Sequence, residues 1–96
     1  MEITLDGKSI KTENDVHRIL AEKLNFGPHY GNNLSALWDR LTTDVERPVR
    51  LILKDAYMSR NAMGDDGFSK VVSVFRDVEQ QDREYKRSEV FVFECE

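Results

Sequence analysis

The sequence predicts an α/β fold: a three-stranded parallel sheet packed with about four helices. Short apolar segments alternate along the chain with longer segments whose apolar residues recur every three or four positions, which indicates strands alternating with helices. The segments 51–53 (LIL) and 90–93 (VFVF) are apolar at consecutive positions, so we expect burial on both faces, as in most parallel sheets. The 96 residues suit one domain, expected over residues 1–96.

A short strand and a helix are expected first. Ile3 and Leu5 alternate with polar residues, and the Asp-Gly pair at 6–7 turns the chain. Thr12 or Asn14 can cap the helix that follows, because their side chains accept hydrogen bonds from backbone N–H groups that have no partner inside the helix. Its apolar face is formed by Val16, Ile19, Leu20 and Leu24. The Gly-Pro pair at 27–28 ends this segment.

The stretch 29–43 (HYGNNLSALWDRLTT) predicts a loop and a second helix. Asn32 or Asn33 can cap the helix, which is expected to reach about Thr43. The i, i+3, i+4, i+7 spacing of its apolar stripe is typical of a helix that packs on a core: Leu34, Leu37, Trp38 and Leu41. Ser35 and Asp39 lie one turn apart on the outward side.

The remaining elements are two helices and two strands. A strand is expected at 49–53 and a short helix at 55–62, closed around the glycine at 64. Asp65 and Asp66 are expected to cap the next helix, which follows the glycine at 67 and has one apolar face: Phe68, Val71, Val72, Phe75 and Val78. The polar residues 80–88 are expected to form a fraying helix end and a loop before the last strand.

Composition limits the function classes. The net charge of −4 and the pI near 5.2 argue against a nucleic-acid partner, which a basic surface would bind, and permit a basic protein partner. A single cysteine, Cys95, excludes an internal disulfide and fits a reducing compartment. No apolar run of signal-peptide or membrane-spanning type is present, so we expect a cytoplasmic protein with no membrane partner.

No motif for cofactor, metal or nucleotide chemistry is present. His17 and His29 are too few and too far apart to suggest a metal site, so neither metal nor cofactor is expected. A nucleophile–base pair of Cys95 and a histidine is conceivable, but a cysteine next to the end of the chain is rarely held rigidly enough for catalysis. We therefore expect a protein that is not an enzyme.

Four residues around the second helix have alternative interpretations. Trp38 is either a core residue or reaches a binding surface with its edge. Tyr30 is as well explained by local packing as by partner contact. Gly31 is most simply a turn glycine with positive φ, and Asp39 most simply a solvated helix residue.

The residues YGNNLSALWDRLT, followed by PVRLIL, resemble the barstar family of intracellular ribonuclease inhibitors. The resemblance extends to the first strand and its glycine turn, the helix start at 15–17 and the segment 71–77 (VVSVFRD), so it spans most of the chain. Ten positions match the family pattern around the second helix: Tyr30, Gly31, Asn33, Leu34, Ala36, Leu37, Trp38, Asp39, Leu41 and Thr42. The resemblance implies a barstar-like three-stranded parallel sheet and, at Arg47–Pro48, a cis peptide bond.

The resemblance also implies a mode of action. In the family, the second helix and the loop before it plug the active site of a small secreted ribonuclease, with carboxylates where RNA phosphates would bind. Asp39 is then the central phosphate mimic and Asp77 a charge at the rim. Barstar is itself a well-known case of an interface dominated by a few hot-spot residues, so the weight given to Asp39 comes from the family resemblance. The implied partner-binding residues are His29, Tyr30, Gly31, Asn33, Ser35, Trp38, Asp39, Thr42, Thr43, Asp44, Glu46 and Asp77.

Three of these residues depart from the family pattern. His29 stands where the family has tyrosine, Ser35 where it has aspartate, and Asp44 where it has tryptophan. The leading hypothesis is an inhibitor or immunity protein, monomeric when free, that binds a basic ribonuclease one to one. The alternatives are a barstar-like module for another toxin or regulatory partner, and a small hydrolase built around His29 and Asp39.

Overall fold

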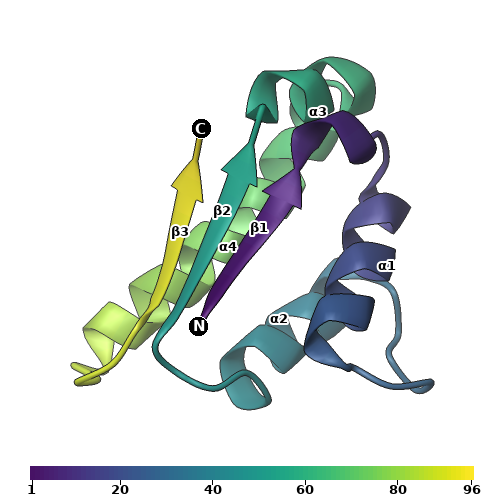
Figure 1. Ribbon diagram of the computed structural model, residues 1–96. Helices are drawn as coiled ribbons and strands as arrows, with labels where there is room; N and C mark the ends of the chain where they lie inside the picture. The colour runs from purple at the N-terminus through teal and green to yellow at the C-terminus, as the bar shows by residue number, and fades with distance from the viewer.

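The computed structural model describes residues 1–96 and has a three-stranded parallel sheet in the order β1-β2-β3 with four α-helices (Figure 1). The strands are β1 (Glu2–Asp6), β2 (Val49–Lys54) and β3 (Phe91–Cys95). The helices are α1 (Glu13–Leu24), α2 (Leu34–Thr43), α3 (Ala56–Met63) and α4 (Asp65–Glu84), and a short 3-10 turn, η1, spans Gly7–Ser9. The predicted α/β class, parallel sheet and number of helices are confirmed. No helix combines the length and the apolar character needed to cross a membrane.

One face of the sheet forms the core and the other faces solvent. Residues of all three strands alternate, so that the core face consists of Ile3, Leu5, Val49, Leu51, Leu53, Phe91 and Phe93, all buried. On the opposite face Arg50 pairs with Glu2 and Glu94 of the two neighbouring strands, and no helix covers it in Figure 1. The expected burial on both faces is correct for residues 51–53, where the outward-facing Ile52 is 4% exposed, and wrong for residues 90–93, where Val90 and Val92 are only half-buried. Ile52 lies between its register partners Thr4 of β1 and Glu94 of β3, on the face that no helix covers.

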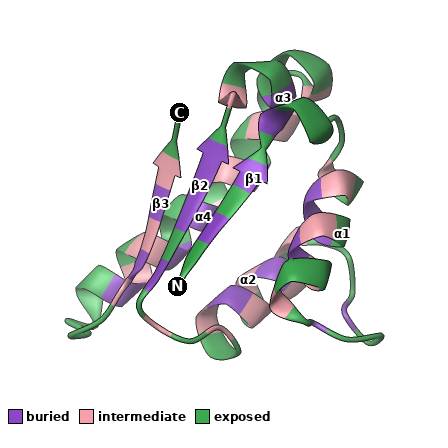
Figure 2. Cartoon of the chain, viewed as in Figure 1, coloured by how far each residue is buried: buried purple, intermediate pink, exposed green.

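The core lies between the sheet and the helices. Helix α4 runs behind the sheet and contacts α2, α3 and β3. One cluster of 17 buried side chains comes from the three strands, from α1, α2 and α4 and from the segments that connect them, and its positions are among the buried ones in Figure 2. Burying this apolar surface is the main favourable contribution to folding. Helix α4 thus packs against both the sheet and α2, and α2 takes its position from this contact.

The helix starts follow the capping chemistry of the sequence. The Thr12 hydroxyl accepts from the Asp15 N–H, and the Asp15 carboxylate accepts from the Thr12 N–H in return, so Thr12 rather than Asn14 caps α1. The side chain of Asn33, rather than Asn32, caps α2. Helix α4 begins at Asp65, directly after Gly64, and not after Gly67. The two aspartates lie inside its first turn, where they favour the helix dipole without capping it.

Helix α4 also continues further than the polar composition of residues 80–88 suggests. It ends at Glu84, and Asp82 in its last turn is completely buried (0% exposed). A carboxylate in the interior needs partners, because an unpaired buried charge is very unfavourable. The expected fraying end is therefore wrong for this turn.

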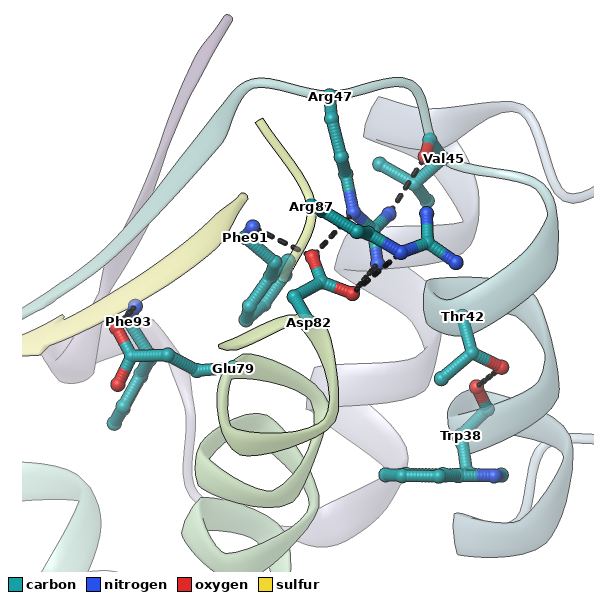
Figure 3. A network of polar contacts seen from close by, with 9 residues as sticks. All are labelled: Trp38, Thr42, Val45, Arg47, Glu79, Asp82, Arg87, Phe91 and Phe93. Atoms are coloured by element: carbon teal, nitrogen blue, oxygen red, sulfur yellow. Dashed lines mark hydrogen bonds and ion pairs between the residues drawn. The ribbon is translucent and has the colours of Figure 1, made fainter. Parts of the chain in front are cut away.

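Asp82 has several partners at once (Figure 3). Its Oδ2 accepts from Arg47 Nε at 2.8 Å and from the Phe91 N–H at 2.7 Å, and Arg87 Nε lies 3.5 Å from Oδ1. Arg47, which precedes a cis peptide bond to Pro48 as expected, also donates to the Val45 carbonyl. Burial alone would raise the pKa of Asp82, but the hydrogen bonds from Arg47 and Phe91 and the two arginine charges together hold it below its ordinary value.

We predict that Asp82→Asn lowers the free energy of unfolding by about 3 kcal/mol or more at pH 7, because it leaves Arg47 buried without a counter-charge. The depressed pKa of Asp82 stabilises the fold above the pKa of an unfolded aspartate, near ~3.9, and this contribution is lost as the pH falls below it. The difference in the free energy of unfolding between the unmodified protein and Asp82→Asn should therefore narrow below about pH 4.

Urea denaturation at pH 7 and in acid measures both effects. Glu84→Gln is the matched control, since it removes an exposed carboxylate two residues away and should change stability by no more than about 0.5 kcal/mol. Equal stability of Asp82→Asn and the unmodified protein at pH 7 contradicts the assignment of Asp82 as the buried anchor.

Candidate functional site

A groove of about 370 Å³ runs between α2 and α4. Its lining residues come from two turns of α2 and one turn of α4: Leu34, Ser35, Trp38, Asp39, Val74 and Asp77. The i, i+4 spacing of Ser35 and Asp39 places both on one face of α2, and the i, i+3 spacing of Val74 and Asp77 does the same on α4. Four predicted site residues, one of them from a distant helix, are thus brought together.

The two carboxylates of the groove have no partner within the protein. Neither the Asp39 nor the Asp77 side chain takes part in a salt bridge or in a side-chain hydrogen bond, and both are exposed. Most other carboxylates of the chain are paired, for example Asp65 with Arg60. Two like charges without counter-charges give the groove a negative potential, which attracts cationic groups of a partner. Trp38 is half-buried beside them and offers an apolar surface.

The loop 25–33, which leads into α2, is fixed at several points. Tyr30 is buried (7% exposed), and its ring packs against Phe26 with the ring centroids 4.8 Å apart. The Tyr30 hydroxyl lies 2.6 Å from His17 Nδ1, and His17 Nε2 lies 2.8 Å from a carboxylate oxygen of Glu13. Because this carboxylate accepts, Nε2 donates, so Nδ1 of the neutral imidazole accepts from Tyr30. Of the two readings of Tyr30, the structure supports the packing role of its side chain.

The exposed residues of the loop lie on either side of this anchor. His29 and Gly31 flank Tyr30 and are exposed, and neither lines the groove. The expected positive φ at Gly31 is wrong, and Asn32 adopts the left-handed conformation instead (φ 52°). A Cβ at position 31 would lie 3.3 Å from the Cβ of Ala36 in the first turn of α2, so a larger residue there would require a small shift of the loop or of the helix. The loop therefore lies close against the N-terminal end of α2.

The C-terminal end of α2 is separate from the groove. The hydroxyls of Thr42 and Thr43 donate back to helix carbonyls, Thr42 to that of Trp38 and Thr43 to that of Asp39. Asp44 ends the helix and lies 3.4 Å from Arg40 Nη1. Asp44 and Glu46 border a different hollow, next to the end of α1. The structure thus divides the predicted site residues among the groove, the loop and this helix end.

Two groove residues are absent from the predicted site. Leu34 belongs to the apolar stripe that is expected to pack on the core, and Val74 lies outside the predicted apolar face of α4. Only the packing of α4 against α2 makes them neighbours of the carboxylates. The one signal available in the sequence was the spacing of Val74 and Asp77, which puts them on the same helix face.

Comparison with known proteins decides the family. Residues 1–94 match the family described as "Barstar (barnase inhibitor)". The chain belongs to the barstar family. It is also 40% identical over 63 residues, 66% of this chain and 69% of the relative, to the Bacillus subtilis (strain 168) protein named "Putative ribonuclease inhibitor YrdF". The fold and the family expected from residues 30–42 are both confirmed.

Membership of the barstar family can be related to the groups that line the groove. The family description names an inhibitor of a ribonuclease, and the groove of this barstar-family chain carries cation-attracting groups and no catalytic constellation of nucleophile and base. No cluster of three or more histidine, cysteine, aspartate or glutamate side chains is placed to hold a metal ion. The groups that this surface exposes are the two carboxylates and part of the Trp38 side chain.

We predict that Tyr30→Phe lowers the free energy of unfolding by about 1–3 kcal/mol at pH 8, because His17 Nδ1 loses its donor in the interior. Burial, together with the Glu13 charge and against that of Arg40, raises the pKa of Tyr30 to about 12. A raised pKa stabilises the fold below the unfolded value, near ~10, and this contribution is lost as the pH rises toward the folded value. The difference in the free energy of unfolding between the unmodified protein and Tyr30→Phe should therefore narrow as the pH rises from the unfolded to the folded pKa of Tyr30.

Chemical denaturation across this pH range is the measurement. Tyr57→Phe is the control, since Tyr57 is exposed and its hydroxyl takes part in no hydrogen bond, so its removal should leave stability within about 0.5 kcal/mol. Loss of stability equal in the two variants would show that the hydroxyl of Tyr30 has no special role.

Proposed function

We propose that this barstar-family chain is an intracellular inhibitor or immunity protein that binds a basic ribonuclease in a one-to-one complex and occludes its active site. The single observation that carries the proposal is the pair of unpaired carboxylates, Asp39 and Asp77, in one groove beside Trp38. The chain then acts by binding and not by catalysis, as the family description of an inhibitor also supports.

The proposed mechanism is mimicry of the RNA backbone. A ribonuclease holds phosphates with arginine, lysine and histidine side chains, and a carboxylate on the rigid α2 can replace a phosphate in such a site. Charge-assisted hydrogen bonds to Asp39 form in a cleft from which water is excluded, where they contribute most. Asp77 adds a second charge from α4, and the net charge of −4 favours the approach of a basic partner.

The neighbouring residues shape the contact. Gly31 and Asn33 approach the partner through the loop, where Asn33 also caps α2 and so fixes its direction. Thr42 and Thr43 border the contact at the far end of α2. Tyr30 contributes mainly by holding His29 and Gly31 in place from below. Glu46 extends the acidic surface beyond the helix.

A second candidate is the same binding mode with a different target. His29, Ser35 and Asp44 replace residues of the family pattern at the proposed contact, and Ser35 lines the groove itself. An interface that lacks one carboxylate and one tyrosine favours a partner with a different arrangement of cations. The target then differs from a barnase-type enzyme while the groove keeps its role.

We predict that Asp39→Ala weakens binding to the native ribonuclease by at least about 2 kcal/mol, the hot-spot threshold. Stability should change by no more than about 0.5 kcal/mol, because the carboxylate makes no internal contact. Association of the unmodified protein should also slow as salt rises, since ions screen charges beyond about 10 Å at 0.1 M ionic strength. Calorimetry, stopped-flow association and urea denaturation measure the three quantities.

Glu22→Ala is the matched control for this variant. Glu22 is an exposed helix carboxylate on α1 that likewise forms no salt bridge, so its removal changes the net charge equally but should leave the affinity nearly unchanged. Equal losses in the two variants would mean that net charge alone drives binding and that the groove is not the site.

The residues that depart from the family pattern lead to a separate prediction. The combined change His29→Tyr and Ser35→Asp should raise the affinity for a barnase-type ribonuclease and lower it for the native partner, by about tenfold in each direction (~1.4 kcal/mol). Asp44 is kept in this variant because it pairs with Arg40. Inhibition titrations of both proteins against both enzymes measure the shift, and tight inhibition of the barnase-type enzyme by the unmodified protein would show that the departures are tolerated.

A further inference from the structure

Arg40 connects α2 to the loop that precedes it. Its Nη1 donates to the backbone carbonyl of Phe26 at 2.8 Å, and its guanidinium carbon lies 5.7 Å from the centroid of the Phe26 ring. The same nitrogen lies 3.4 Å from a carboxylate oxygen of Asp44, one turn further along α2. Arg40 is partly buried and does not line the groove, so its contacts are internal to the protein.

These contacts fix the first half of the 25–33 loop through Phe26. The contact of His17 with Tyr30 fixes its second half. Phe26 packs against Tyr30, and the Tyr30 N–H donates to the Gly27 carbonyl at 3.4 Å. The exposed turn 27–29, which includes His29, therefore lies between two residues that internal contacts hold in place, Phe26 and Tyr30. Gly27 has a positive φ (81°), and a Cβ at this position would have no neighbouring atom within 4 Å, so the turn is open to solvent here.

We propose that Arg40 is a positioning residue for the partner surface: it fixes the 25–33 loop before binding, and Asp44 holds the guanidinium in place. This inference rests on the proposed function. A loop ordered in the free protein does not have to be ordered at the moment of binding, so the complex gains affinity without a new contact. Asp44 then acts through Arg40, and its charge is compensated before any partner arrives.

Charge and positioning predict opposite results for the removal of Arg40. Arg40→Met keeps a linear apolar side chain and makes the protein one unit more negative, so steering alone would favour a basic partner. If Arg40 positions the loop, the same change weakens binding. A weaker complex from a more acidic protein therefore cannot be an effect of net charge.

The first measurement uses the free protein. Amide hydrogen exchange at Phe26 and Tyr30, whose N–H groups are bonded to the Ala21 and Gly27 carbonyls, should speed up about tenfold or more in Arg40→Met, because a charge-assisted hydrogen bond to the loop is lost. Arg40→Lys should recover part of the protection. Arg18→Met, which removes an arginine paired with Asp15 on α1, is the matched control and should leave both amides unchanged.

The second measurement is a double-mutant cycle against a barnase-type ribonuclease and against any ribonuclease captured from the source cells. Arg40→Met should weaken binding about tenfold, and the loss should disappear in a His29→Ala background if Arg40 acts through the loop. Asp44→Asn should give a smaller loss of the same kind, which keeps the test available if Arg40→Met folds poorly.

The outcomes separate the inference from the proposed function. Unchanged exchange in Arg40→Met, or the same loss of affinity with and without His29, overturns the positioning role even where the protein inhibits a ribonuclease. Failure of the unmodified protein to bind any ribonuclease overturns the proposed function and the partner role of Arg40 with it, while faster exchange in that case still assigns Arg40 the ordering of the loop.

Discussion

The buried carboxylate of Asp82 is the interaction on which the arrangement of the other elements depends. It joins the last turn of α4 to the backbone of β3 at Phe91 and, through Arg47, to the connection between α2 and β2. Arg47 lies 35 positions before Asp82 and Phe91 nine positions after it, and each of the three segments carries a polar group that needs a partner in the interior. Satisfying all of them with one carboxylate fixes α4 relative to the sheet and limits where α2 can lie.

The groove follows from this placement. Asp39 and Asp77 lie on different helices, 38 positions apart in the numbering, and they face the same hollow only because α2 packs against α4. Below this surface the polar groups are paired: Tyr30 with His17, and Arg40 with Phe26 and Asp44. At the groove itself the carboxylates are left without partners. Such a division between satisfied internal groups and free surface charges is what a rigid recognition surface requires.

Several features could be predicted because they depend on neighbours in the chain. Caps at Thr12 and Asn33 are local hydrogen bonds, and the apolar stripe of α2 reflects the period of a helix. The contiguous family pattern at residues 30–42 likewise made the membership of the chain visible. Burial was harder to predict: the polar surroundings of Asp82 suggested a frayed end, and the consecutive apolar residues 90–93 suggested burial on both faces, although Val90 and Val92 are only half-buried. In both cases the deciding partner lies on another element.

The sequence by itself determined the order of strands and helices, two candidate caps each for α1 and α2 and the membership of the barstar family, since all three are recorded in contiguous residues. Only the tertiary structure decided that Tyr30 is an anchor with His29 and Gly31 exposed beside it, that Arg40 donates to the Phe26 carbonyl, and that Asp77 shares a groove with Asp39. The physical reason is that pairing and exposure of a charged side chain depend on groups distant in the sequence, which meet only when α2 and the loop before it pack on α1 and α4.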